Sequence, residues 1–141
     1  MIKLENIKIN QNFKDKYEIF KIAEEDLVKL NSVKRGYQQA MINRDKSASV
    51  ALGNYLFLPH GEDGSQDLIL KNEVLVYHLK DVINIDENEI KVVVVLALKA
   101  SNQMEYIEKI GIAFSDIDDV EKVMFDEQVT AQKIHDFLTQ E

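Results

Sequence analysis

The feature that most constrains the fold is an unbroken apolar run in the second half of the chain. Residues 92–98 read Val-Val-Val-Val-Leu-Ala-Leu, and the first half of this run is β-branched. A strand that is apolar at every position has both of its faces covered. Seven residues are also far too few to span a bilayer. The sequence therefore predicts a central strand over residues 90–100, with helices on both faces of its sheet.

Helical and extended patterns alternate along the rest of the chain. Residues 2–9 fit a short strand or an extended arm, and strands are predicted at 55–58 and 74–79, with a loop over 46–54 and a polar turn region over 82–89. Apolar residues at helical spacing indicate helices over residues 16–30 and 34–45, the second with Tyr37 on its apolar face. Three more helices are predicted after capping residues: one from Ser101–Asn102 to about 114, one from Ser115 to 124, and one after Thr130. Because strands and helices are interleaved, the expected fold class is α/β, a three-layer sandwich of a mixed β-sheet with helices on both faces.

Charge and cysteine content narrow the classes of partner and site. The 141 residues carry a net charge of −8 and no cysteine. This excess of negative charge disfavours nucleic acid and anionic lipid as partners, and it suits a partner with a positively charged face. Without cysteine there is no disulfide, thiolate nucleophile or Cys-based zinc site. With no linker, repeat or signal-peptide segment, we expect a single cytoplasmic domain over residues 1–141.

A histidine stands where one of the predicted strands stops. The segment 56–61 reads Leu-Phe-Leu-Pro-His-Gly, and Pro59 is the only proline in the chain. Proline ends a strand, and Gly61 permits close approach of a loop or another molecule. Strand ends are where open α/β sheets place their chemistry, and neutral imidazole is a good nucleophile. The alternative is a histidine that only satisfies a structural bond. No metal is expected, since no second ligand of the usual spacing lies nearby.

The remaining candidates are weaker when taken one at a time. Arg44 lies where the second helix should end, so it suits either a solvated helix terminus or a clamp for phosphate. On this residue alone the helix terminus is favoured. His78 lies inside a strand and His135 on the last helix, and neither is assigned a catalytic role. The acidic segments lack the spacing of a calcium loop, and residues 61–64 lack the glycine pattern of a nucleotide loop.

Taken in order, these motifs resemble the phosphohistidine region of the mannitol/fructose enzyme IIA family, whose members are phosphocarrier domains of the bacterial sugar phosphotransferase system. The resemblance is carried by four segments: Asn43-Arg44-Asp45-Lys46, Gly53-Asn54, Pro59-His60-Gly61 and Lys109-Ile110-Gly111-Ile112-Ala113-Phe114-Ser115. Sixteen positions separate the arginine from the histidine. The mannitol branch fits best.

The resemblance implies a fold, a reaction and a set of partners. The fold would be a mixed sheet with helices on both faces. Nε2 of His60 would accept a phosphoryl group from the histidine-containing phosphocarrier protein and pass it to a cysteine of an enzyme IIB domain. Sugar would enter through a separate membrane enzyme IIC chain. Arg44 would hold the phosphoryl oxygens, together with nearby backbone N–H groups, and no cofactor or metal is required.

Two positions depart from the mannitol branch. Gln103 stands where that branch usually carries a second histidine, and a glutamine amide donates a hydrogen bond but does not titrate. Glu62 follows Pro-His-Gly where a small hydroxyl residue is usual. These departures leave a second hypothesis, a regulatory module of the same fold whose phosphorylation state controls a partner protein. A third is an unrelated α/β protein in which the Pro-His pair is structural.

Overall fold

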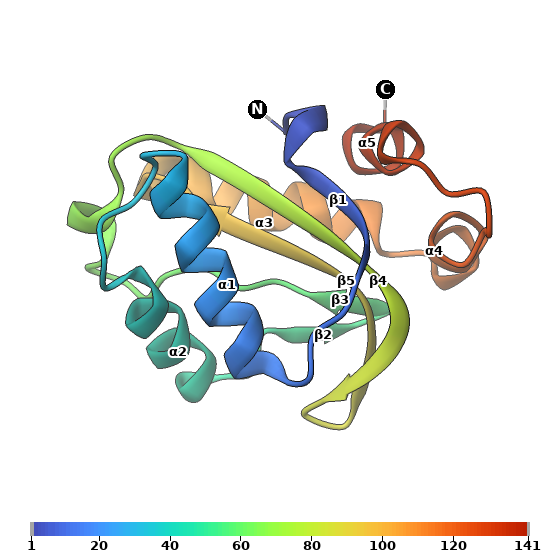
Figure 1. Cartoon of the computed structure of the whole chain (residues 1–141), viewed down its shortest axis with the longest axis horizontal. Helices are drawn as coiled ribbons and strands as arrows, with labels where there is room; N and C mark the ends of the chain where they lie inside the picture. Colours follow the sequence, from blue (N-terminus) through green and yellow to red (C-terminus); the bar gives the residue numbers. More distant parts are fainter. Residues whose placement is uncertain (1, 141) are drawn as a thin grey trace.

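The computed structural model describes residues 2–140 (Figure 1), so positions 1 and 141 at the ends of the expected domain lie outside the described residues. Its elements in chain order are η1 (Leu4–Asn6), β1 (Ile7–Gln11), α1 (Lys16–Lys29), α2 (Tyr37–Ser47), β2 (Ala51–Gly53), β3 (Tyr55–Phe57), η2 (Gln66–Leu68), β4 (Glu73–Ile85), β5 (Asn88–Ala97), α3 (Ala100–Ala113), α4 (Ile117–Met124) and α5 (Ala131–Thr139).

The five strands form one mixed sheet with β5 at its centre. The strand order is β1-β4-β5-β3-β2. β1 runs parallel to β4, and β3 runs parallel to β5. The pairs β4–β5 and β2–β3 are antiparallel. The apolar run is therefore the middle strand, as the sequence predicts.

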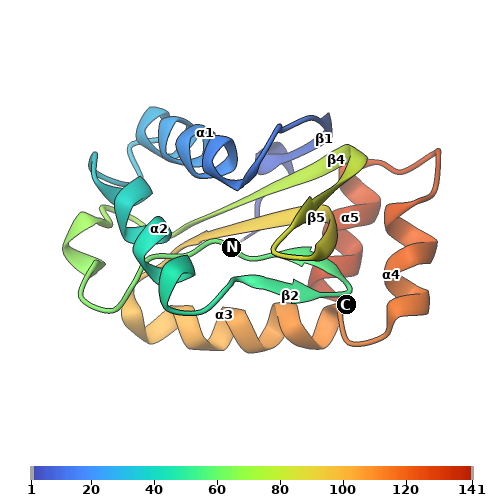
Figure 2. The ribbon, with the colours of Figure 1, turned by 90° about the horizontal axis from the view of Figure 1, so that it is seen from below.

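Helices cover both faces of this sheet, which confirms the expected three-layer architecture. Figure 2 shows α1 on one side of the sheet and α3 on the other. Alternate β5 residues point to opposite faces, as a period of two requires. Val93 and Val95 belong to the core under α1 and α2. Val92 and Val94 belong to the core under α3, α4 and α5.

Two segments that the sequence predicts as loop or turn are partly β-strand in the structure. The region 82–89 is not a broad polar turn, because β4 continues to Ile85 and β5 starts at Asn88. Only Asp86 and Glu87 form the turn, with φ of 51° and 67°. Such a two-residue turn usually carries Asn-Gly or Asp-Gly, so the sequence lacked its ordinary signal. In the predicted loop 46–54, residues 51–53 form β2 and pair with β3.

Three helix starts differ from the sequence prediction, and two agree. α1 begins at Lys16 as predicted. Thr130 caps α5 as predicted, accepting a bond from the Lys133 amide. Asp116 rather than Ser115 caps α4, because its carboxylate accepts from the Asp118 amide at 2.9 Å. α3 begins at Ala100, so Ser101 and Asn102 lie inside its first turn rather than before it. The Asn102 side chain instead accepts a bond from Asn72. α2 begins at Tyr37, three residues later than predicted.

Candidate functional site

His60 lies three residues after the end of β3, and a backbone carbonyl holds one of its two ring nitrogens. It forms an isolated parallel bridge with Leu96 of β5, next to a bond from the Leu96 amide to the Pro59 carbonyl at 2.9 Å. Its Nδ1 lies 2.8 Å from the Leu58 carbonyl oxygen. Because a carbonyl can only accept, Nδ1 carries the proton and Nε2 keeps its lone pair. The sequence pointed to the histidine, and the structure supplies the group that sets its tautomer.

The surroundings of His60 favour the neutral imidazole. Only 5% of the residue is exposed, and this burial lowers its pKa below the usual 6.5. The bond to Leu58 acts in the opposite direction, and the positive charge of Arg44 lowers the pKa further. Burial disfavours the charged form, so the ring is neutral at pH 7. A neutral ring with a bare Nε2 is the nucleophilic form of histidine.

Tyr37 is a part of this site that reasoning from the sequence missed. Its side chain is fully buried at the first position of α2. The hydroxyl donates to the Leu96 carbonyl at 2.6 Å and accepts from the Gly61 amide at 2.9 Å. Burial raises its pKa, so the phenol is protonated. In the sequence, Tyr37 is indistinguishable from an ordinary aromatic residue on the apolar face of a helix.

The loop that follows His60 is fastened to α2. The Glu62 amide donates to the Ala40 carbonyl at 3.2 Å, and the Asn43 side chain donates to the Glu62 carboxylate at 2.6 Å. The amides of Gly61 and Glu62 are therefore both engaged within the protein. These two groups do not match the expectation that nearby backbone N–H groups hold a phosphoryl group. The unusual Glu62 carboxylate is itself anchored by Asn43.

Arg44 lies near the end of α2, as predicted, and its side chain bonds to the backbone there. Its Nη1 donates to the Ala48 carbonyl at 2.9 Å, which caps the C-terminus of α2. Its charge nevertheless contributes to the lowered pKa of His60. The next residue, Asp45, is buried and accepts from the Val50 amide at 3.1 Å. This bond fixes the path of the chain from Arg44 toward β2.

Gln103 lies in the first turn of α3, half-buried. α3 follows the end of β5 at Ala97, and the bridge between His60 and Leu96 lies at that same end of β5. Gln103 therefore follows the carboxyl end of β5, the end at which Leu96 bridges His60.

The two other histidines each bond to a backbone carbonyl. Nε2 of His78 lies 2.8 Å from the Met124 carbonyl at the end of α4. Nε2 of His135 lies 3.0 Å from the Ile2 carbonyl, which ties α5 to the start of the chain.

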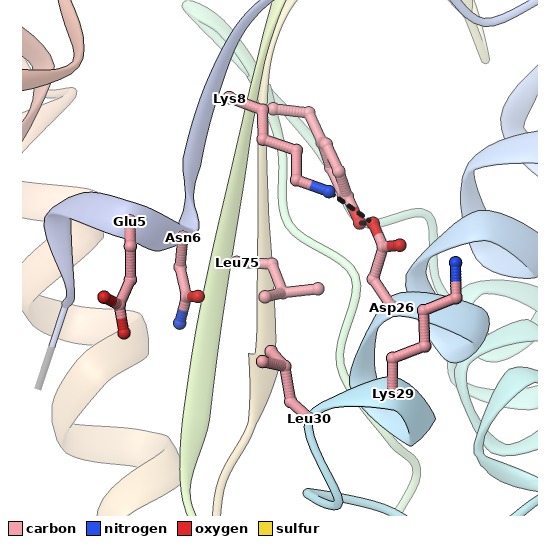
Figure 3. A pocket seen from close by; sticks show the side chains of 8 residues that line it. Glu5, Asn6, Lys8, Asp26, Lys29, Leu30 and Leu75 are labelled. Carbon is pink, nitrogen blue, oxygen red and sulfur yellow. Dashed lines mark hydrogen bonds and ion pairs between the residues drawn. The ribbon is translucent and has the colours of Figure 1, made fainter.

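A separate hollow of about 210 Å³ lies between α1, β1 and β4 (Figure 3), away from these residues. Three of its polar side chains bond to one another. The Asp26 carboxylate accepts from Lys8 at 3.3 Å and from the Tyr77 hydroxyl at 2.5 Å. His60, Arg44 and Gln103 are not among its lining residues. The hollow therefore adds nothing to the His60 site.

The described part of the chain shows neither a metal cluster nor a membrane span. Within residues 2–140, no three or more His, Asp or Glu side chains are grouped so that they could hold a metal ion. Over the same residues, every helix is too short or too polar to cross a membrane.

Comparisons with known proteins point to one family. The family model described as "Phosphoenolpyruvate-dependent sugar phosphotransferase system, EIIA 2" matches residues 1–141. The mannitol-specific phosphotransferase enzyme IIA component of Mycoplasma pneumoniae is 43% identical over 133 residues, which are 94% of this chain and 93% of that protein. Its counterpart in Halalkalibacterium halodurans is 30% identical over 138 residues, 98% of this chain and 94% of that protein.

Solved structures show the same fold. The crystal structure of IIA mannitol from Escherichia coli matches with a TM-score of 0.84 at 23% identity, covering 98% of this chain and 99% of that one. A complex of Escherichia coli enzyme IIA mannitol with phosphorylated enzyme IIB mannitol matches with a TM-score of 0.86 at 23% identity, covering 100% of this chain and 99% of the matched chain.

Proposed function

The chain belongs to the EIIA 2 family of the phosphoenolpyruvate-dependent sugar phosphotransferase system, and on this premise we propose that His60 is the residue that carries its phosphoryl group. The observation that carries the proposal is the bond from Nδ1 to the Leu58 carbonyl, which leaves Nε2 as the free nucleophile. Its relatives are named mannitol-specific, and we propose the same sugar for this chain.

The proposed reaction moves a phosphoryl group between two imidazoles. The lone pair on Nε2 of His60 forms a bond to phosphorus while the nitrogen–phosphorus bond of the donor phosphohistidine breaks. The bonding electrons return to the donor ring. The proton on Nδ1 of His60 stays on its bond to Leu58 throughout, so the reacting nitrogen neither gains nor loses a proton. The protein contributes position and charge stabilisation rather than covalent chemistry.

Arg44 is proposed to stabilise the phosphoryl oxygens. Its planar guanidinium has five N–H donors, and the bond to Ala48 uses one of them on Nη1. We expect the remaining N–H donors to bond to the oxygens of the transferred phosphoryl group. This anchoring at Ala48 reduces the conformational freedom that the side chain loses when it binds phosphate. Loss of one such donor from a preorganised site typically slows a reaction about 10²–10³-fold.

Gln103 is proposed to donate one amide hydrogen to the same group. Unlike a histidine, it stays uncharged at every physiological pH. We predict that Gln103→His is tolerated and makes the rate of phosphorylation depend on pH near the pKa of a histidine. Circular dichroism checks the fold, and a pH series of single-turnover rates checks the role. A variant that unfolds would instead make position 103 structural.

The partners follow from the direction of transfer. We propose the phosphorylated histidine-containing phosphocarrier protein as donor and an enzyme IIB cysteine as acceptor. Sugar passage is assigned to a separate enzyme IIC chain in the membrane, and the relay is placed in the cytoplasm. The net charge of −8 suits a donor that presents a positive face.

The decisive experiment labels the chain with phosphorylated phosphocarrier protein. We expect one phosphoryl group per wild-type chain, none on His60→Gln, and full labelling of the control His135→Gln. Enzyme IIB is then added. Rapid transfer to its cysteine supports the relay, whereas a label that no enzyme IIB removes would favour the regulatory module. An unlabelled wild type beside a labelled relative would refute the proposal.

A further inference from the structure

Two backbone groups that flank His60 converge on a single phenolic oxygen. The Leu96 carbonyl lies 2.6 Å from the Tyr37 hydroxyl, and the Gly61 amide lies 2.9 Å from it. Leu96 is the residue of β5 that forms the bridge with His60. Gly61 directly follows His60 in the sequence. The hydroxyl thus joins the sheet to the loop at the point where the loop carries the imidazole.

The backbone on both sides of Tyr37 is held in place by a side chain of α1. The Glu24 carboxylate accepts from the Gly36 amide at 2.7 Å and from the Gln38 amide at 3.0 Å, one on each side of Tyr37. Glu24 is only 7% exposed. It satisfies the first free amides of α2, where Gly36 offers no capping side chain. The phenol therefore extends from a helix start with little freedom to move.

The fit at Gly61 is too close for a larger residue. A Cβ there would lie 2.8 Å from the Tyr37 ring and 2.4 Å from Ser65 Oγ. The loop backbone rests directly on the phenol, so a shift of one moves the other. Because Nδ1 of His60 bonds to a carbonyl only two residues earlier, movement of this loop changes that bond and with it the tautomer.

We propose that Tyr37 is a positioning residue that keeps His60 in its Nδ1–H tautomer with Nε2 directed at the donor. The proposal rests on the proposed function of His60 as phosphoryl acceptor. Tyr37 touches neither donor nor phosphoryl group in this scheme and acts through the backbone on both sides of His60. Misplacement of a reacting group by about 1 Å can slow transfer about 100-fold, so a residue of this kind affects the rate without taking part in the chemistry.

The chain offers a matched control. Tyr77 is also buried, and its hydroxyl also makes a hydrogen bond, to Asp26. That bond lies at the hollow between α1, β1 and β4, which His60 does not line (Figure 3). Replacement of either tyrosine by phenylalanine removes one buried hydroxyl from a protein core. Only Tyr37→Phe removes it from the His60 loop.

The test compares Tyr37→Phe, Tyr77→Phe and wild type by two measurements. Nitrogen-15 NMR of the His60 ring reports its tautomer and pKa without any partner protein. Single-turnover phosphorylation by phosphorylated phosphocarrier protein reports the rate. We expect Tyr37→Phe to give averaged ring-nitrogen shifts and a rate about 10- to 100-fold lower. We expect Tyr77→Phe to lose similar stability while keeping the wild-type ring signals and rate.

The outcomes separate this inference from the proposed function. Wild-type ring signals in Tyr37→Phe, or equal changes in both variants, would overturn the role of Tyr37. A wild type that is never phosphorylated would overturn the proposed function, while the NMR comparison would still decide how Tyr37 acts. If Tyr37→Phe does not fold, Gly61→Ala tests the same contact from the loop side. It retains the hydroxyl but presses on the ring, so it should also average the His60 signals, and unchanged signals would refute the inference.

Discussion

Removal of the Glu24 carboxylate should destabilise the start of α2, the helix that carries Tyr37. Glu24→Ala leaves the Gly36 and Gln38 amides without their present acceptor. Each hydrogen bond to a charged group contributes about 1.5–3 kcal/mol, and loss of a helix cap usually costs about 0.5–2 kcal/mol. The two amides are only partly buried, so water recovers some of this loss. We expect the free energy of unfolding to fall by about 2–3 kcal/mol.

Urea and thermal unfolding followed by circular dichroism measure this change. For a domain of this size each kcal/mol lowers Tm by about 3–4 °C, so Tm should fall by about 6–12 °C. Glu25→Ala is the matched control, because it makes the same charge change at the neighbouring, half-buried position of α1. Its effect should stay near 0.5 kcal/mol, as is usual away from special contacts (about ±0.5). Equal losses in the two variants would refute the assignment of Glu24 as the cap of α2.

Two further predictions concern buried polar groups. Burial lowers the pKa of His78 below 6.5 in the folded state, so the unfolded chain takes up the proton first as the pH falls. The contribution of His78 to stability is then complete above about pH 6.5 and declines below it. His78→Gln should make the free energy of unfolding, measured in urea between pH 7 and 5, fall less steeply with pH. An unchanged pH dependence would assign the decline to other groups. Lys16→Met should cost about 2 kcal/mol in the same assay, because it leaves the buried Asp45 carboxylate, now 2.8 Å from the lysine, without its charged partner. No loss of stability would show that water or Val50 suffices for Asp45.

The sequence predicts the architecture well because the central strand has a simple physical signature. A run of apolar residues in residues 92–98 requires cover on both faces, and helical spacing on either side supplies it. The turn at Asp86 and Glu87 was missed because it uses residues atypical of a turn with two positive φ values. β2 was missed because a three-residue strand has almost no pattern of its own.

The sequence is sufficient to predict His60 as the candidate residue, but not the hydrogen bonds that hold it. Pro59 and Gly61 mark His60 in the sequence, but the acceptor for Nδ1 is a backbone carbonyl, and its direction depends on the folded path of the chain. Tyr37 has the spacing of a core residue, and only the structure shows its hydroxyl between β5 and the loop after His60. The bond from Arg44 to the Ala48 carbonyl likewise depends on the folded path of the chain.

The alternation along β5 has a consequence for how this chain can vary. Val93 serves one core and Val94 the other, so exchange of one aliphatic residue for another alters a single core locally. Deletion or insertion of one residue within β5 would instead send every later side chain to the wrong face, exchanging the contents of both cores at once. It would also move Leu96 out of line with His60. The most repetitive stretch of this sequence should therefore tolerate many substitutions and almost no change in length.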